Sequence, residues 1–124
     1  MAVRLSNLRD HSFIGVAHFL SSGDIARLYF MGQFKIAHLR EQGINLIIIP
    51  LDSSFGYKSE SDQHDIISGL QACASSAGLA GTVVPIWREG SGHCFIAPPN
   101  WHPFFKTFSW TDVMRNINKE LTCG

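Results

Sequence analysis

The feature that most constrains the fold is a continuous apolar run at Ile44–Leu51, broken only by Asn45 and Pro50. A β-branched run of this kind is typical of a strand with both faces covered, at the centre of a sheet. The run is far too short to cross a bilayer, which takes about 20 residues. The sequence therefore predicts a buried central strand in a soluble domain that has no membrane partner.

Further elements are expected on both sides of this run. Residues 13–20 are mostly apolar and are followed by Ser-Ser-Gly at 21–23, a pattern typical of a first strand and its loop. From Asp24 the apolar residues take helical spacing up to a glycine stop at Gly43. A second stretch of helical spacing begins after the polar loop 52–61 and ends near Gly78.

The last third of the chain indicates a hairpin and a helix. Residues 82–87 and 93–97 flank a glycine-bearing connection, which favours two antiparallel strands. Residues 98–106 are rich in proline and aromatic side chains and are expected to form a loop. A capping-box pattern at Ser109–Asp112 then begins a helix that continues through Leu121.

Together these elements predict one domain over residues 1–124, of α/β class with α+β character. The expected order is β-α-β-α-β-β-α, with a four-stranded mixed sheet flanked by helices. This order resembles the thioredoxin-like fold, most closely in the strand at 81–86, the hairpin turn at 88–92 and the capped helix from Ser109. The resemblance implies the fold alone, because Ser-Ser-Gly-Asp at 21–24 replaces the family's thiol motif and Gly-Thr-Val at 81–83 replaces its cis-proline.

Charge and cysteine content narrow the possible functions. Ten basic and ten acidic side chains give zero net charge, and the basic ones are spread along the chain, which disfavours nucleic-acid binding. The cysteines at 73, 94 and 123 are odd in number and form no C-x-x-C motif, so neither a disulfide framework nor a metal site is predicted. We expect a cytoplasmic protein in a reducing compartment, without a cofactor.

A possible catalytic motif is Gly92-His93-Cys94, which is similar to the histidine-bearing strand of papain-like cysteine hydrolases. Such an enzyme needs a thiolate paired with that histidine. Adjacent strand residues project to opposite faces, so Cys94 cannot serve His93, and Cys73 falls inside a helix. We predict no catalytic residue, and the chemical role of His93 and Cys94 stays open.

A small-molecule site is expected at the C-terminal ends of the first two strands, since ligands of open α/β sheets bind at such an edge. The exit of the fourth strand should bring residues 101–102 to the same edge. The candidate ligand-binding residues are Ser21, Ser22, Asp52, Tyr57, Trp101 and His102.

An excess of aromatic residues points to a subunit interface. Residues 101–110 hold five large aromatics, and three helices already supply enough apolar surface for a four-stranded sheet. We predict a homodimer whose interface includes Phe30, Phe34, Phe104 and Phe105. The leading function is a non-catalytic binding or self-associating interaction module with a small-molecule or protein partner. The alternative is a small-ligand enzyme of hydrolase or transferase type, with its site at the strand ends.

Overall fold

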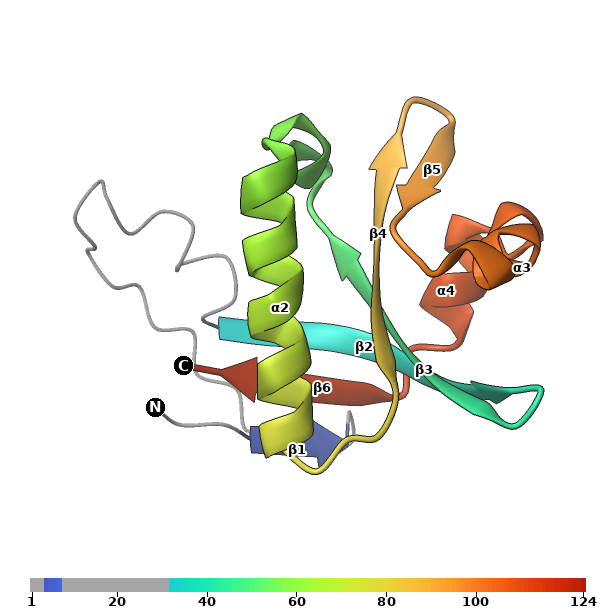
Figure 1. Cartoon of the computed structure of the whole chain (residues 1–124). Coiled ribbons are helices and arrows are strands. Elements are labelled where there is room, and N and C mark those ends of the chain that lie inside the picture. The colour runs from blue at the N-terminus through green and yellow to red at the C-terminus, as the bar shows by residue number, and fades with distance from the viewer. Residues whose placement is uncertain (1–3, 8–31) are drawn as a thin grey trace.

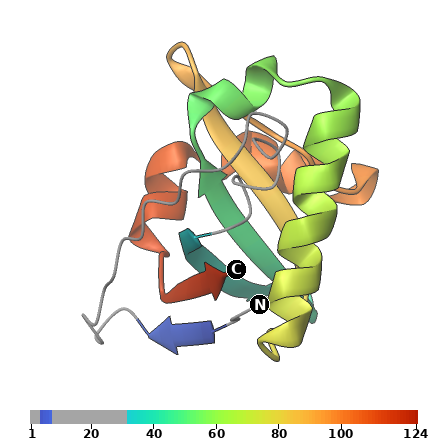
Figure 2. The same cartoon turned by 90° about the vertical axis from the view of Figure 1, so that its left-hand side faces the viewer.

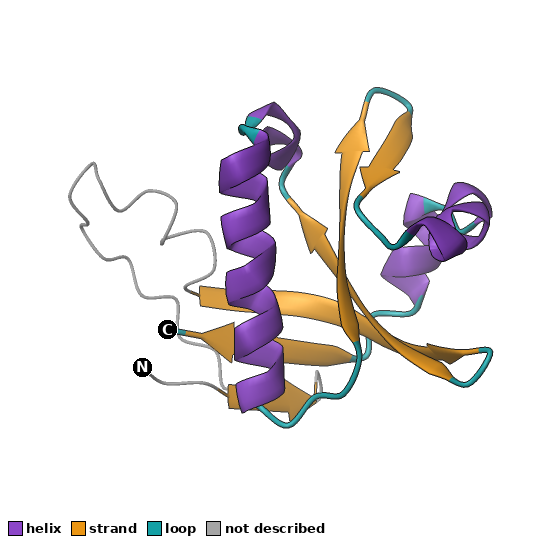
Figure 3. Cartoon of the chain, in the orientation of Figure 1, coloured by secondary structure: helices purple, strands orange, loops and turns teal. Residues whose placement is uncertain are grey.

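The computed structural model describes residues 4–7 and 32–124, which form an α+β fold with a mixed sheet and helices on both of its faces (Figure 1, Figure 3). Within these residues the sheet has six strands in the order β1-β6-β2-β3-β4-β5, so the mixed sheet is confirmed but the expected four strands are too few. The strands are β1 Arg4–Asn7, β2 Gly32–Glu41, β3 Ile44–Leu51, β4 Thr82–Glu89, β5 Gly92–Phe95 and β6 Lys119–Cys123. The helices are η2 Ser53–Tyr57, α2 Glu60–Ser76, η3 Pro99–Trp101, α3 His102–Thr107 and α4 Trp110–Arg115.

The apolar run Ile44–Leu51 forms β3 and lies inside the sheet, as predicted. It pairs antiparallel with β2 and parallel with β4. Its side chains alternate between two cores: Ile47 and Ile49 face α2, while Leu46 and Ile48 face α3 and α4. Burial on both faces explains why the run is apolar at successive positions.

The helix expected from Asp24 to Gly43 is wrong over residues 32–41, which form β2; its first part and the strand expected at 13–20 lie outside the described residues. Gln42 and Gly43 have φ angles of 51° and 78°. Two successive positive φ angles are what a two-residue hairpin turn requires, so Gly43 is a turn residue rather than a helix stop. Backbone pairing with β3 and β6 then outweighs the helical spacing.

The predicted second helix is confirmed as α2, which covers one face of the sheet (Figure 1, Figure 2). Its N-cap Ser59 accepts a hydrogen bond from the backbone N–H of Asp62. Ile66 and Leu70 are fully buried and pack in the same core as Ile49 of β3. The helix thereby provides the crossover that two parallel strands require.

The opposite face of the sheet is covered by α3 and α4. The prediction of a loop at 98–106 is wrong, because η3 and α3 occupy most of this segment. Pro99 and Pro103 lie in the first turns of η3 and α3, where a proline is tolerated because the N–H there has no helical partner. Trp101 and Phe105 are buried against Leu46 and Ile48. The aromatic residues order this segment by packing on the sheet.

The last helix is shorter than predicted. The capping box is confirmed, since Ser109 accepts from the backbone N–H of Asp112 and the Asp112 carboxylate accepts from that of Ser109. The helix ends at Arg115, however, and β6 follows. The Asn118 side chain hydrogen-bonds both the N–H and the carbonyl of His38, which places β6 beside β2.

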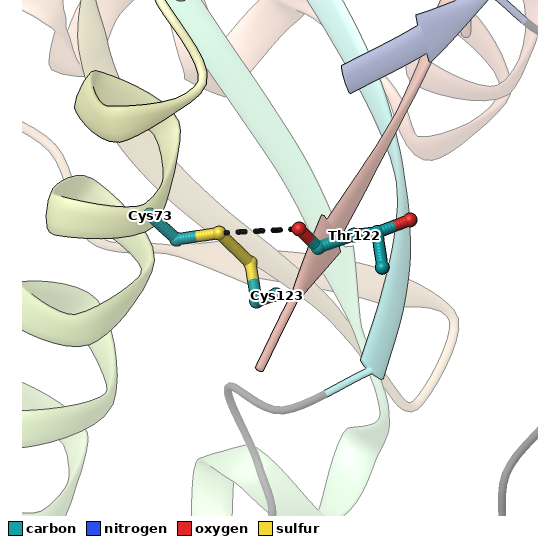
Figure 4. The surroundings of a disulfide bond; sticks show 3 residues. All are labelled: Cys73, Thr122 and Cys123. Carbon is teal, nitrogen blue, oxygen red and sulfur yellow. Dashed lines mark hydrogen bonds between the residues drawn. A yellow bond between two sulfur atoms is a disulfide. The ribbon is translucent and has the colours of Figure 1, made fainter. Parts of the chain in front are cut away.

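A disulfide joins Cys73 of α2 to Cys123 of β6, so the prediction that the cysteines form no disulfide framework is wrong for these two residues (Figure 4). Their Cα atoms are 5.9 Å apart across 50 residues of sequence, and both side chains are buried in the core under α2. The Sγ atom of Cys73 also lies 3.7 Å from the Thr122 carbonyl oxygen. The reducing compartment loses its support, because disulfides persist mainly in oxidising surroundings.

Candidate functional site

Two of the candidate ligand residues lie at the two ends of η2, directly after β3. The Asp52 carboxylate is the N-cap of η2 and accepts from the Ser54 backbone N–H at 3.0 Å. Hydrogen bonds from the side chain and backbone of Ser54 hold the pKa of Asp52 below its ordinary value. Tyr57 is 90% exposed. Ser21 and Ser22 lie outside the described residues.

The other two candidate residues lie elsewhere. Trp101 is buried in the core under α3, on the face of the sheet opposite to Phe55 of η2. The His102 imidazole donates from Nε2 to the Ala97 carbonyl at 2.9 Å, since a carbonyl can only accept. The structure therefore does not bring these two side chains to Tyr57.

A small cavity lies at the C-terminal ends of the parallel strands β3 and β4. The site was expected at the ends of the strands at 13–20 and 44–51, and the first of these lies outside the described residues. The volume of the cavity is about 170 Å³, and we call it the strand-end cavity. Gly56 packs so closely on Trp87 that an added Cβ would lie 2.5 Å from the indole Nε1, which explains the glycine at this position. The lining residues are Ser53, Gly56, Tyr57, Trp87, Arg88, Glu89 and Gly90.

Side chains at the end of β4 alternate between the two faces of the sheet. Glu89 accepts a hydrogen bond from the Cys94 thiol, and Cys94 is the register partner of Trp87, so these three side chains share a face. The Arg88 guanidinium lies on the other face, 5.9 Å from the centre of the Trp110 ring. Arg88 therefore meets the cavity through its main chain, and Glu89 supplies the side-chain charge.

His93 and Cys94 have different partners, as expected for neighbours in a strand. The His93 imidazole donates from Nε2 to the Phe105 carbonyl at 2.9 Å. The hydrogen bond to Glu89, together with burial and the charge of Glu89, raises the pKa of the Cys94 thiol to about 11. A thiol held protonated in this way is the reverse of an activated nucleophile.

We expect Cys94 to react slowly with iodoacetamide at pH 8. A pKa of about 11 in place of 9.0 leaves roughly a hundredfold less thiolate than an ordinary cysteine has. Glu89→Gln removes the negative charge and should speed alkylation, while Glu60→Gln, at an exposed acid on α2, should not. Intact-mass spectrometry over time measures the rate. A wild-type rate equal to that of free cysteine would contradict this assignment.

A second hollow, the β2–α4 groove, forms where β2 changes partners. Residues 32–36 of β2 pair with β6, and residues 37–41 pair with β3. β3 meanwhile continues beside β4 as far as Leu51. The two strands therefore separate and leave a groove of about 420 Å³ beside α4. It is lined by Gln33, Phe34, Lys35, Pro50, Leu51, Trp110, Met114 and Ile117.

The predicted interface residues fall into different environments. Phe105 is completely buried within the chain, so its assignment to an exposed patch is wrong. Phe104 is half-buried and stacks on Phe108, with ring centres 5.0 Å apart. Phe34 is half-buried and lines the groove, while Phe30 lies outside the described residues.

Sequence reasoning missed Met114, which is 40% exposed at the groove. A signal was present, because Trp110 and Met114 are four residues apart and therefore share a helix face. Fully buried Val113 occupies the core face of the same helix.

Within residues 4–7 and 32–124, no group of three or more His, Cys, Asp or Glu side chains is placed to hold a metal ion. No helix within the same ranges combines the length and the apolar character needed to span a bilayer.

Comparison of the chain with known protein families finds no match. Neither curated proteins nor solved structures match it. The similarity to the thioredoxin-like fold therefore stays a prediction.

Proposed function

We propose that this protein is an interaction module that self-associates as a homodimer through the β2–α4 groove. The observation that carries the proposal is the composition of the groove: Phe34, Leu51, Trp110, Met114 and Ile117 give it an apolar floor and rim. Partly exposed apolar side chains that line one hollow are typical of a protein contact. Aromatic residues and methionine are also enriched in interfaces.

A second copy of the chain is the occupant that fits this groove best. The chain has zero net charge, so copies do not repel one another strongly. A twofold axis brings the same surface of both copies together, and such a surface needs a projection as well as a hollow. Met114 lines the groove and is 40% exposed, and it is the side chain that we expect to enter the groove of the other copy. Its flexible thioether suits an irregular apolar hollow.

The alternative, a small-ligand enzyme at the strand ends, has less support. It would require a reactive side chain in the strand-end cavity. The thiol nearest to it, Cys94, is held protonated by Glu89. The cavity is better suited to ligand binding than to nucleophilic chemistry.

We expect Met114→Lys to raise the dimer dissociation constant at least about tenfold, because a charge would have to be buried in the partner's apolar groove. Ile44→Lys is the matched control, since Ile44 is 48% exposed and does not line the groove. Sedimentation equilibrium of both variants and of the wild type makes the comparison. A monomeric wild type, or equal weakening by both substitutions, would refute the proposed dimer.

A further inference from the structure

The strand-end cavity has aromatic walls of two kinds. The Trp87 indole is 7% exposed and is held in place by Phe55, with ring centres 5.0 Å apart, and by the close approach of Gly56. Tyr57 stands at the rim and is 90% exposed, so its ring is available to a ligand. One wall is therefore rigid, and the other is a ring in solvent that a bound group can cover.

The side-chain charge at the cavity is negative. Glu89 lines the cavity, and its carboxylate accepts a hydrogen bond from the Cys94 thiol, which is neutral and therefore does not cancel the carboxylate charge. Asp52 precedes the lining residue Ser53 and is ionised at neutral pH, since hydrogen bonds from Ser54 lower its pKa. Arg88 also lines the cavity, but its guanidinium lies on the opposite face of the sheet, beside Trp110, and Lys58 is not among the lining residues.

The shape of the cavity limits the size of its ligand. Its volume of about 170 Å³ is below the roughly 300–1,000 Å³ of pockets that hold drug-sized molecules. It can take the end of a side chain or a small amine, and it is too small for a nucleotide. The cavity lies at the C-terminal ends of parallel strands, which is where open α/β sheets commonly bind their ligands.

We propose that the strand-end cavity binds an alkylammonium group, held between Tyr57 and Trp87 and neutralised by Glu89. A cation over an aromatic face is attracted by the ring quadrupole, and a nearby carboxylate adds Coulomb attraction. The group is the charged end of a lysine side chain or of a free small amine. This ligand is independent of the proposed dimer, because the β2–α4 groove shares no lining residue with the cavity.

The test is a titration of the full chain with tetramethylammonium chloride, butylammonium chloride or N-acetyl-lysine amide at constant ionic strength, followed by ¹H–¹⁵N NMR. The Trp87 indole N–H signal, assigned with Trp87→Phe, reports on the cavity wall. We expect a saturable shift of this signal with the ammonium probes and none with sodium acetate. Saturation by N-acetyl-lysine amide but not by butylammonium would identify a peptide lysine as the source, and the reverse would identify a free amine.

Variants separate charge from packing. Glu89→Gln should weaken binding roughly fivefold, because it removes the charge but keeps an acceptor for the Cys94 thiol. Tyr57→Leu should weaken it several-fold, whereas Tyr57→Phe retains the ring and should bind like the wild type. The matched control is Glu60→Gln, an exposed acid that does not line the cavity. No saturable Trp87 shift, an equal shift with acetate, or equal weakening by the two glutamine variants would overturn the proposal.

Discussion

Replacement of both Cys73 and Cys123 with serine is expected to lower the free energy of unfolding by about 4 kcal/mol. The bridge closes a loop of 50 residues, and its loss restores conformational entropy to the unfolded chain. Domains of this size are stable by only about 5–15 kcal/mol, so this is a large fraction of the total. Urea denaturation followed by circular dichroism gives the change from the shift of the midpoint.

Two measurements separate the bridge from side effects of the serines. Dithiothreitol added to the wild type should shift the midpoint in the same direction without any mutation. Cys94→Ser, at the cysteine outside the bridge, should leave the effect of dithiothreitol intact. Iodoacetamide should label at most one thiol before reduction and three after unfolding and reduction. A midpoint that dithiothreitol does not move would mean that the bridge does not form.

Phe105→Ala is expected to destabilise the fold by about 3–5 kcal/mol. The ring is fully buried, with the rings of Phe95 and Phe104 centred 5.4 Å and 5.1 Å away. Replacement with alanine loses the favourable free energy of transferring the ring from water to the core. It also leaves an empty space in the core, in which the surrounding side chains lose their packing contacts. Thermal or urea unfolding measures the loss.

The neighbouring Phe104→Ala is the matched comparison, because Phe104 is only half-buried. We expect it to cost clearly less stability than Phe105→Ala. The pair also decides between the sequence-based assignment of Phe105 to an interface and its burial in the core. If Phe105→Ala changed the oligomeric mass and left the unfolding midpoint in place, the core assignment would be wrong.

Short-range patterns were good predictors of the elements that local chemistry determines. Ile44–Leu51 is apolar enough to require a covered strand, and it is one. Ser109 and Asp112 form the capping box that their spacing predicts. The hairpin near Gly90 was also correct, although β4 extends to Glu89, β5 is Gly92–Phe95, and only Gly90 and Ser91 lie between them.

The strand-end cavity could be predicted only in part. The rule that ligands bind at the C-terminal ends of parallel strands, with the loop after Leu51, led to Tyr57. It did not lead to Trp87 and Glu89, because these residues reach the end of β3 only through the parallel pairing of β3 with β4. The expected exit of the fourth strand wrongly added Trp101, which is buried in the core under α3.

What the sequence determined by itself was the class of fold, the central strand, α2 and the capped start of α4, since each depends on residues within a few positions of one another. Only the tertiary structure decided that residues 32–41 form a strand, because their helical spacing competes with pairing to β6, whose register partners lie 83 to 91 residues further along the chain. It also decided that Cys73 meets Cys123, which no count or spacing of cysteines can show. The physical reason is the same in each case: backbone pairing and side-chain burial depend on which distant segments share a face of the sheet.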